Sequence, residues 1–291
     1  LDSFNMPALF TRTSIFPYLS TVFSTTVSVS ASLLTSALMM FAKKVVLVTG
    51  GSSGIGAAAA TCFAKEGATI AIVGRNEEKL KGVAKRCEKL KAKTLVIKAD
   101  VTKDDEAKNI IKQTIDNFGR LDVLVNNAGI AKFSTVEESN LLGIYDEIMN
   151  TNLRSILHIT NLAVPYLKET KGNIVNVSSI ASLKVMTTGM GPYSISKAGI
   201  DLFTRSSALE LASSGVRVNC INPGPVKTEL FQASNSPAYL VSDIGNIENR
   251  TALGRLSEAE EIGDLILYLA SEKARSITGS SYVIDNGILL K

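Results

Sequence analysis

Residues 43–60 read KKVVLVTGGSSGIGAAAA. A continuous apolar run follows the two lysines, as expected for a strand that is buried on both faces. The run enters a turn with glycines at positions 50, 54 and 56, and an alanine-rich helix is expected after it. Glycines at such a turn let the backbone turn tightly and let a phosphate approach the amides of the helix N-terminus. This stretch therefore predicts a phosphate-binding turn on the first strand of a parallel sheet.

The order of helix, glycine and apolar strand recurs along the chain. Glycines at positions 67, 119, 172 and 215 close expected helices, and each precedes an apolar segment. The expected strands are 43–48, 69–73, 94–98, 121–125, 173–177, 216–221 and 281–284. Parallel strands need crossover helices. The pattern therefore predicts an α/β fold with a single doubly wound parallel sheet of the Rossmann type, with helices on both faces, over residues 41–291.

Composition limits the classes of function. The chain has 291 residues, 45% of them hydrophobic and 20% charged, which is ordinary for a globular enzyme or binding protein. The net charge is +4. The densest basic stretch, residues 79–93, has helical spacing and fits a solvated helix face better than a nucleic-acid site. The three cysteines form no close pair, which argues against a disulfide framework or a metal site and predicts a reducing compartment, the cytoplasm.

Residues 1–40 differ from the rest of the chain. No charged residue occurs between Thr13 and Ala42, and serine and threonine alternate there with apolar residues. The stretch is too rich in hydroxyl side chains for a convincing membrane span. It resembles a mitochondrial presequence in being rich in serine and poor in acidic residues, but Arg12 is its only basic residue. We therefore interpret residues 1–40 first as a disordered extension or leader, second as a transit peptide, and third as a membrane anchor.

The glycine turn and the second strand indicate which nucleotide binds. The spacing Gly50-x-x-x-Gly54-x-Gly56 is not the usual dinucleotide fingerprint, and it lacks the Lys-Ser/Thr ending of an ATP or GTP loop. A methyltransferase could carry such a turn. The second strand ends without the acidic residue that binds the ribose hydroxyls of NAD. The guanidinium of Arg75 suits a 2′-phosphate, so NADP(H) is favoured over NAD(H); an ordinary solvated arginine is the alternative.

Tyr193 and Lys197 are four residues apart and are expected on one face of a helix. A free phenol has a pKa near ~10 and is a poor proton carrier at neutral pH. An ammonium beside it favours the phenolate, so we expect Lys197 to lower the pKa of Tyr193. If this pair is considered without the other motifs, the alternative is that both residues lie on the solvent-exposed side of an amphipathic helix and have no catalytic role. The only histidine, His158, lies among apolar residues, where we expect a packing role.

Together these motifs resemble the short-chain dehydrogenase/reductase family, in its classical form, over residues 44–288. The resemblance implies four catalytic residues, Asn152, Ser179, Tyr193 and Lys197, with Ser178 as the alternative serine. Tyr193 would be the general acid/base, and Lys197 would lower its pKa and hold the nicotinamide ribose. Ser179 would hydrogen-bond the substrate oxygen, and Asn152 would fix a water through which Lys197 exchanges protons.

The same resemblance implies a set of cofactor contacts from six segments of the chain. Besides Tyr193 and Lys197, they are Thr49, Gly50, Ser52, Ser53, Gly54, Ile55, Gly56, Arg75, Asn76, Asp100, Val101, Asn127, Ala128, Gly129, Pro223, Gly224, Val226 and Thr228.

The implied function is an NADP(H)-dependent oxidoreductase that interconverts a lipophilic ketone and a secondary alcohol of steroid, terpenoid or β-ketoacyl type. The alternatives are an NAD(H)-dependent alcohol dehydrogenase of the same fold and a member that binds nucleotide without turnover. Residues 224–256 form a long irregular connection, which predicts a lid over an apolar pocket or a dimer contact. Its apolar residues are Leu230, Phe231, Tyr239, Leu240, Val241 and Ile244.

The resemblance also implies a homodimer or homotetramer that pairs through two long helices, around 152–168 and 193–212. Neither a nucleic acid nor a membrane is expected as a partner. The expected partner is a small carbonyl or alcohol substrate.

Overall fold

The computed structural model describes residues 39–230 and 247–291. Our interpretation of residues 1–40 therefore falls almost wholly outside the described residues. The same is true of the apolar side chains at positions 231, 239, 240, 241 and 244, on which the lid prediction depended. Leu230 is the one member of that apolar group within the described residues.

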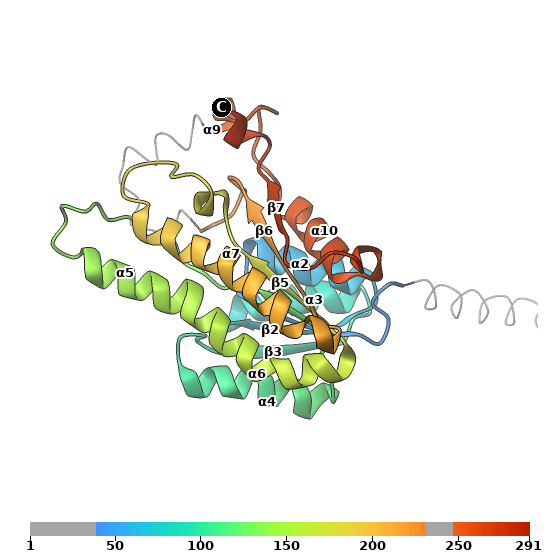
Figure 1. Cartoon of the computed structure of the whole chain (residues 1–291). Helices are drawn as coiled ribbons and strands as arrows, with labels where there is room; N and C mark the ends of the chain where they lie inside the picture. The colour runs from blue at the N-terminus through green and yellow to red at the C-terminus, as the bar shows by residue number, and fades with distance from the viewer. Residues whose placement is uncertain (1–38, 231–246) are drawn as a thin grey trace, which may run out of the picture. The chain divides into compact units, whose positions relative to one another are not determined.

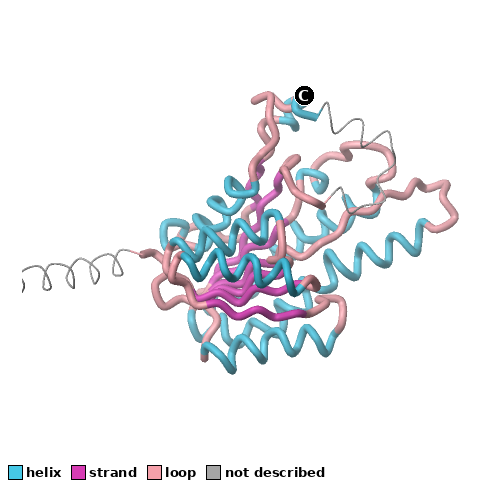
Figure 2. The backbone as a smooth tube through the Cα atoms, turned by 180° about the vertical axis from the view of Figure 1, so that it is seen from behind, coloured by secondary structure: helices cyan, strands magenta, loops and turns pink. Residues whose placement is uncertain are grey.

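A parallel sheet with the strand order β3-β2-β1-β4-β5-β6-β7 forms the centre of the fold (Figures 1 and 2). This confirms the predicted doubly wound sheet, and each predicted strand is present. β4 begins two residues later than predicted, where the buried Asp122 carboxylate accepts the N–H of Val45 at 2.9 Å. The strands are β1 Val45–Thr49, β2 Thr69–Gly74, β3 Thr94–Lys98, β4 Val123–Asn126, β5 Asn173–Val177, β6 Arg217–Pro223 and β7 Ser281–Ile284.

Helices cover both faces of this sheet (Figure 1). One face packs against α2, α3 and α10, and the other against α4, α6 and α7. β1 supplies both cores, because successive side chains of a strand point to opposite faces: Val46 and Val48 join the first, and Val45 and Leu47 the second. The helices are α2 Gly54–Lys65, α3 Glu77–Lys89, α4 Asp104–Phe118, α5 Leu141–Met149, α6 Ser155–Thr170, α7 Gly191–Leu211, α9 Ile247–Arg250 and α10 Ala259–Ala270.

α4 begins at Asp104, and three acidic residues in its first turn complement the positive end of the helix dipole. One helix end differs from the prediction. α6 ends with Lys171 in the left-handed conformation, at φ 49°, and not with Gly172. Gly172 is required for a different reason, since a Cβ there would lie 2.5 Å from the carbonyl oxygen of Asp122.

The glycine turn between β1 and α2 depends on close backbone contacts. Gly50 has φ +64°, and a Cβ on it would lie 2.8 Å from the Cα of Ala128, just after β4. Gly56 lies in the first turn of α2, where a Cβ would lie 2.3 Å from the carbonyl oxygen of Gly50. The absence of side chains therefore lets α2 start directly against the turn, with its N-terminus at the carboxyl edge of the sheet.

This geometry predicts opposite effects for two glycine-to-alanine substitutions. Gly56→Ala should destabilise the fold by about 1–3 kcal/mol, because the added methyl overlaps backbone that has little room to move. Gly82→Ala on α3 should stabilise it by about 0.5–1 kcal/mol, since nothing lies within 4 Å of its added Cβ. Urea denaturation measures both free energies of unfolding. Equal effects of the two changes would contradict this account of the turn.

Candidate active site

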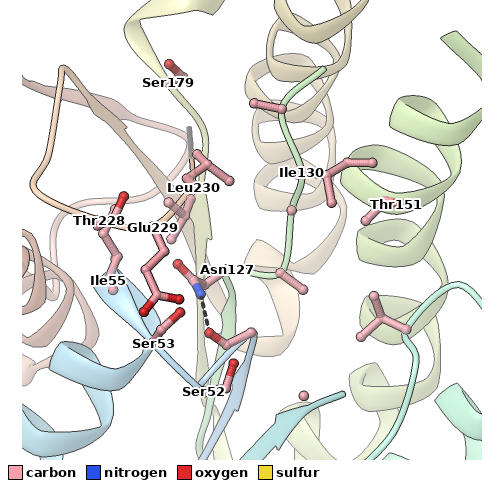
Figure 3. A pocket seen from close by; sticks show the side chains of 18 of the residues that line it. Ser52, Ser53, Ile55, Asn127, Ile130, Thr151, Ser179, Thr228, Glu229 and Leu230 are labelled. Atoms are coloured by element: carbon pink, nitrogen blue, oxygen red, sulfur yellow. Dashed lines mark hydrogen bonds between the residues drawn. The ribbon is translucent and has the colours of Figure 1, made fainter. Parts of the chain in front are cut away.

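A cavity of about 450 Å³ opens at the carboxyl edge of the sheet, above β1, β4, β5 and β6 (Figure 3). Ligands of open α/β sheets bind at this edge, where the strand order reverses. Every residue expected to contact the cofactor lines this cavity, except Thr49, Gly56 and Asn76. The expected catalytic residue Ser179 also lines it. The structure therefore brings residues from seven distant segments of the chain to one cavity.

Thr49 braces the turn from behind the cavity. Its hydroxyl accepts the N–H groups of Asn127 and Ala128 at 3.0 and 3.1 Å and lies 3.3 Å from the carbonyl of Val125. The amide of Asn127 donates in return to the carbonyls of Thr49 and Gly50, both at 3.0 Å. Figure 3 shows Asn127 beside the turn. Thr49 thus ties the end of β1 to the segment after β4, and it lies outside the cavity lining.

Gly56 and Asn76 also lie outside the cavity lining, for local reasons. Gly56 packs against the backbone of Gly50. Asn76 is the N-cap of α3, and its side chain accepts the N–H of Lys79 at 3.0 Å. This capping contact satisfies one of the free amides of the helix and turns the Asn76 side chain toward its own helix.

Asp100 and Arg75 form the end of the cavity beside β2 and β3. Burial alone would raise the pKa of Asp100, but the N–H and hydroxyl of Thr102, at 3.0 and 2.8 Å, and the nearby Arg75 hold it below its ordinary value. Asp100 is therefore a carboxylate at neutral pH and an acceptor for an amino group. Arg75 offers the guanidinium that a phosphate would need.

The segment after β6 crosses the mouth of the cavity. Glu229 forms an ion pair with Lys79 of α3 at 2.5 Å, and Thr228 lies against Gly54. Both acidic Glu229 and apolar Leu230 line the cavity (Figure 3). The sequence reasoning did not include Glu229, because an ion pair between residues 150 positions apart leaves no local pattern.

The cavity has further walls that the sequence prediction missed. Ile130, Ala131 and Lys132 follow Gly129 along the chain, and Glu147 and Thr151 lie on α5 and the turn after it. The position of residues 130–132 directly after β4 is a signal that could have found them, because segments that follow parallel strands meet at the same edge of the sheet. No comparable signal marks Glu147.

The two neighbouring serines have different environments. The hydroxyl of Ser178 donates to the backbone carbonyl of Lys197 at 3.0 Å and is buried. Ser179 begins a short 3₁₀ turn over Ile180–Ser182 and faces the cavity, where its hydroxyl is near enough to the phenol of Tyr193 to lower the pKa of that group. The geometry therefore places Ser179 beside the phenol and uses Ser178 to hold α7 against β5.

Burial dominates the titration of Tyr193, whose side chain is almost fully inaccessible. It raises the pKa of the phenol to about 12, and the hydrogen bond from Ser179 offsets only part of the rise. The Nζ atom of Lys197 lies 5.6 Å from the ring centre and donates to the carbonyl of Val177 at 2.9 Å. Our expectation that Lys197 lowers the pKa of Tyr193 is therefore wrong for this arrangement, because the ammonium is directed at β5.

The side chain of Lys197 is buried as well. Desolvation lowers its pKa to about 8, although the charge of Asp201, one helical turn further on, acts in the opposite direction. Lys197 is thus mostly cationic at neutral pH, and Tyr193 is protonated. A neutral phenol next to a cation is the form that can give a proton to a substrate oxygen.

Asn152 lies behind the cavity in a π-helical turn, Asn150–Arg154, between α5 and α6. Its side-chain oxygen accepts the N–H of Ile130 at 2.8 Å, and its amide donates to the carbonyl of Ile130 at 2.9 Å and to Ser196 at 3.1 Å. Asn152 therefore fastens the segment after β4 to α7. The continuous helical pattern of the sequence concealed this turn, which widens the helix where Asn152 points inward.

Comparisons with known proteins agree with this geometry. The family model described as Enoyl-(Acyl carrier protein) reductase matches residues 50–289. The 3-oxoacyl-(acyl-carrier-protein) reductase of Thermotoga maritima is 35% identical over 252 residues, which cover 85% of this chain and 98% of that protein. L-fucose dehydrogenase of Bos taurus is 32% identical over 85% of this chain and 90% of its own. A short chain dehydrogenase from Burkholderia cenocepacia, solved in complex with NADP, has a TM-score of 0.78 at 31% identity, covering 86% of this chain and 99% of its own.

The chain belongs to the short-chain dehydrogenase/reductase family, in its classical form. It is an oxidoreductase that acts on alcohol or carbonyl substrates and binds NAD(P). This excludes the methyltransferase that the glycine turn alone left open.

Several other features of the described residues bear on function. Cys62, Cys87 and Cys220 are all buried free thiols. Within residues 39–230 and 247–291, no cluster of three histidine, cysteine or acidic side chains has the arrangement of a metal site. None of the helices in this part of the chain combines the length and the apolar character needed to cross a bilayer. His158 lies on α6, with Nδ1 3.5 Å from Asp104, away from the cavity lining.

The burial of Lys197 predicts how turnover depends on pH. Because its pKa is about 8, the ammonium keeps its charge below that pH and loses it above. We expect kcat for carbonyl reduction to be level between about pH 6 and 8 and to fall tenfold per pH unit at higher pH. A pH profile of initial rates, with circular dichroism at each pH as a control for folding, measures this. A level profile up to about pH 10 would contradict a role for the charged lysine.

Proposed function

We propose that this protein is an NADP(H)-dependent reductase that converts a lipophilic ketone into a secondary alcohol. The observation that carries the proposal is the phenol of Tyr193, which is buried at the cavity between the hydroxyl of Ser179 and the ammonium of Lys197. Burying a titratable phenol beside a cation has no value for a protein that only stores a nucleotide, so the arrangement disfavours the alternative without turnover.

The residues of the cavity fit a dinucleotide. The glycine turn presents the backbone amides at the start of α2 to a pyrophosphate, the carboxylate of Asp100 fits the adenine amino group, and Arg75 fits a 2′-phosphate. When bound, NADPH supplies the hydride for the reaction. The fit of a glycine turn, an acceptor and a guanidinium in one cavity supports binding in a single orientation, with the nicotinamide toward Tyr193.

Side chains of the protein then bind the substrate oxygen and protonate it. Ser179 donates a hydrogen bond to the carbonyl oxygen, where negative charge develops during hydride transfer. Tyr193 gives its proton to the same oxygen, and the protonated phenol is the form that burial favours. Lys197 holds the nicotinamide ribose, and its ammonium can return a proton to the phenolate that remains. Asn152 keeps the wall at Ile130 in place, and the water that we expect it to fix would return a proton through Lys197.

The choice of NADP(H) over NAD(H) rests on the end of β2. Gly74 and Arg75 line the cavity there, and the next residue, Asn76, caps α3. An acidic side chain for the ribose hydroxyls of NAD is absent from this position. A solved relative from Burkholderia cenocepacia binds NADP. An NAD(H)-dependent alcohol dehydrogenase of the same fold is the alternative.

The cavity lining near Tyr193 is partly apolar, with Ile130, Ala131 and Leu230 beside the polar Lys132, Glu147 and Thr151. A cluster of hydrophobic side chains includes Tyr193 and Leu230 and supports the apolar part of this lining from behind. Such a wall supports a steroid, terpenoid or β-ketoacyl substrate, and the similarity to a 3-oxoacyl-(acyl-carrier-protein) reductase favours the last of these. The members of the cluster are Ala131, Ile148, Ala181, Met190 and Tyr193, with Ile130, Phe133, Ile144, Met186 and Leu230 packed against them.

We further propose that two copies, or four, pair through α6 and α7. Leu202 and Leu209 on α7 are 62% and 83% exposed, and apolar side chains on a long helix are typical of a helix–helix interface. The buried free thiols support a reducing compartment, which we take to be the cytoplasm.

Removing the Tyr193 hydroxyl separates binding from turnover. Tyr193→Phe should lower kcat at least about 100-fold, because general acid catalysis contributes about 10²–10⁴, and it should leave the Kd for NADPH nearly unchanged. Stopped-flow and fluorescence titration measure the two quantities. Tyr268→Phe, an exposed position on α10, is the control and should behave as the unaltered protein. Substantial turnover in Tyr193→Phe would refute the assigned role.

Removing the Arg75 guanidinium tests the cofactor. Arg75→Ala should weaken NADPH binding by roughly 10- to 100-fold, the effect of losing a hydrogen bond to a charged group. NADH binding should change by less than about twofold. Arg86→Ala, an exposed arginine on α3, is the matched control. Equal losses for the two cofactors in Arg75→Ala would withdraw the NADP(H) assignment.

The proposed interface predicts the mass in solution. Light scattering should find two or four times the chain mass of 31.0 kDa. Leu209→Glu should yield single chains, because a buried carboxylate without a partner disfavours association. Val136→Glu, at a position that is also highly exposed but lies outside both helices, should leave the mass unchanged. A monomer in the unaltered protein would be the contrary result.

A further inference from the structure

Asp201 is a buried carboxylate that no step described above uses. It lies on α7 one turn after Lys197 and is only 6% exposed. The hydroxyl of Ser182 lies 2.6 Å from its Oδ2 atom. The amide nitrogen of Asn222, near the end of β6, lies 3.0 and 3.2 Å from its two oxygens. A carboxylate in such a place costs free energy unless hydrogen bonds or an opposite charge compensate for lost water, so its surroundings must provide them.

The two neutral partners of Asp201 also hold the backbone of Ser179. The Ser182 hydroxyl lies 2.7 Å from the Ser179 carbonyl oxygen, and the Asn222 amide nitrogen lies 3.1 Å from it. Ser182 and Asn222 are themselves 2.9 Å apart. The carboxylate is therefore connected, through two side chains, to the residue whose hydroxyl meets the phenol. The same network reaches Pro223 and Gly224, which line the cavity.

The charges around Asp201 single out one cation. Its hydrogen-bonding neighbours are neutral, and the thiol of Cys220 on β6 lies 3.5 Å from Oδ1. Lys197 faces the same region from the same helix face. The titratable groups that face Lys197 are Tyr193 and Asp201 on α7 and Cys220 on β6. Of these three, burial raises the pKa values of Tyr193 and Cys220 to about 12, which leaves both groups neutral at neutral pH.

We propose that Asp201 is a positioning residue that joins the Ser179 turn to the end of β6 and supplies the negative charge that keeps the buried Lys197 cationic. The carboxylate acts through Ser182, Asn222 and Lys197, and it lies outside the cavity lining. Its importance for turnover rests on the function proposed above. Its effect on the charge of Lys197 does not.

The charge of Lys197 can be measured without turnover. Trace acetylation with acetic anhydride modifies only the unprotonated amine, so peptide mass spectrometry of samples labelled at successive pH values gives the midpoint for each lysine. In Asp201→Asn, which keeps the side-chain shape and removes the charge, the Lys197 midpoint should move down by roughly one pH unit. Asp201→Ser removes the same charge and leaves room for a water, so the same shift is expected if Asp201→Asn fails to fold.

Two controls separate the charge from the hydrogen bonds. Ser182→Ala removes a partner of Asp201 and keeps the carboxylate, so the Lys197 midpoint should stay where it is in the unaltered protein. Asp116→Asn, an exposed charge on α4, should change neither the midpoint nor kcat. A Lys197 midpoint that stays in place when the Asp201 charge is removed would overturn the proposal.

Turnover provides the second readout. In Asp201→Asn, the fall of kcat at high pH should move to lower pH by the same amount as the labelling midpoint, with the KM for NADPH within about twofold of the unaltered value. A loss of kcat without this movement would mean a purely structural role and would overturn the proposal. If the unaltered protein reduces no ketone, the proposed function is wrong, and the labelling midpoints still decide whether Asp201 sets the charge of Lys197.

Discussion

The hydrogen bond from Lys197 to the carbonyl of Val177 is the contact on which the site depends. It joins the first third of α7 to the end of β5 at 2.9 Å, in surroundings that exclude water. A buried ammonium must have such a partner, so the register of α7 along the strand is fixed. Tyr193 then stands one turn before Lys197, and Ser179 follows Val177 by two residues. A single buried cation thus brings the phenol and the hydroxyl together.

Neutral polar contacts beneath the site support this register. Asn126 of β4 donates to Asn176 of β5 at 2.9 Å, and Asn176 donates to Thr204 of α7 at the same distance. These side chains are fully buried, where each unpaired polar atom would cost free energy. The ladder therefore resists any slip between the two strands and the helix. Together with the Thr49 and Asn127 contacts at the glycine turn, it makes the floor of the cavity rigid.

The sheet could be predicted from the sequence because its strands are continuous apolar runs, each with turn residues on either side. The pattern is local, and burial on both faces repeats it in the five central strands, β2, β1, β4, β5 and β6. Helix ends were less predictable. Gly172 was expected as a cap by analogy with three other glycines, but Lys171 takes the left-handed conformation instead. Gly172 leaves space for the carbonyl oxygen of Asp122, just before β4, and so distant a contact leaves no local pattern in the sequence.

Residue type and chemistry indicated Tyr193, Lys197 and the glycine turn, and all of these line the same cavity. Their roles stay predictions. The sequence did not indicate where a side chain turns inward to brace a wall, as Thr49, Asn76 and Asn152 do when they bond to protein backbone. The direction of the shift in the Tyr193 pKa was also missed, because the sequence spacing of Tyr193 and Lys197 shows neither the burial of the phenol nor that the ammonium donates to the carbonyl of Val177.

The central claim is that hydride reaches a carbonyl carbon at the same cavity in which Tyr193 protonates the oxygen. The most direct measurement is the transfer of deuterium from NADPH labelled at both nicotinamide C4 positions to an aliphatic β-keto thioester, followed by mass spectrometry of the alcohol. The account predicts one deuterium on the carbinol carbon of every product molecule, and none in protein carrying Tyr193→Phe. An alcohol without deuterium, or labelled alcohol formed equally well without the phenol, would contradict it.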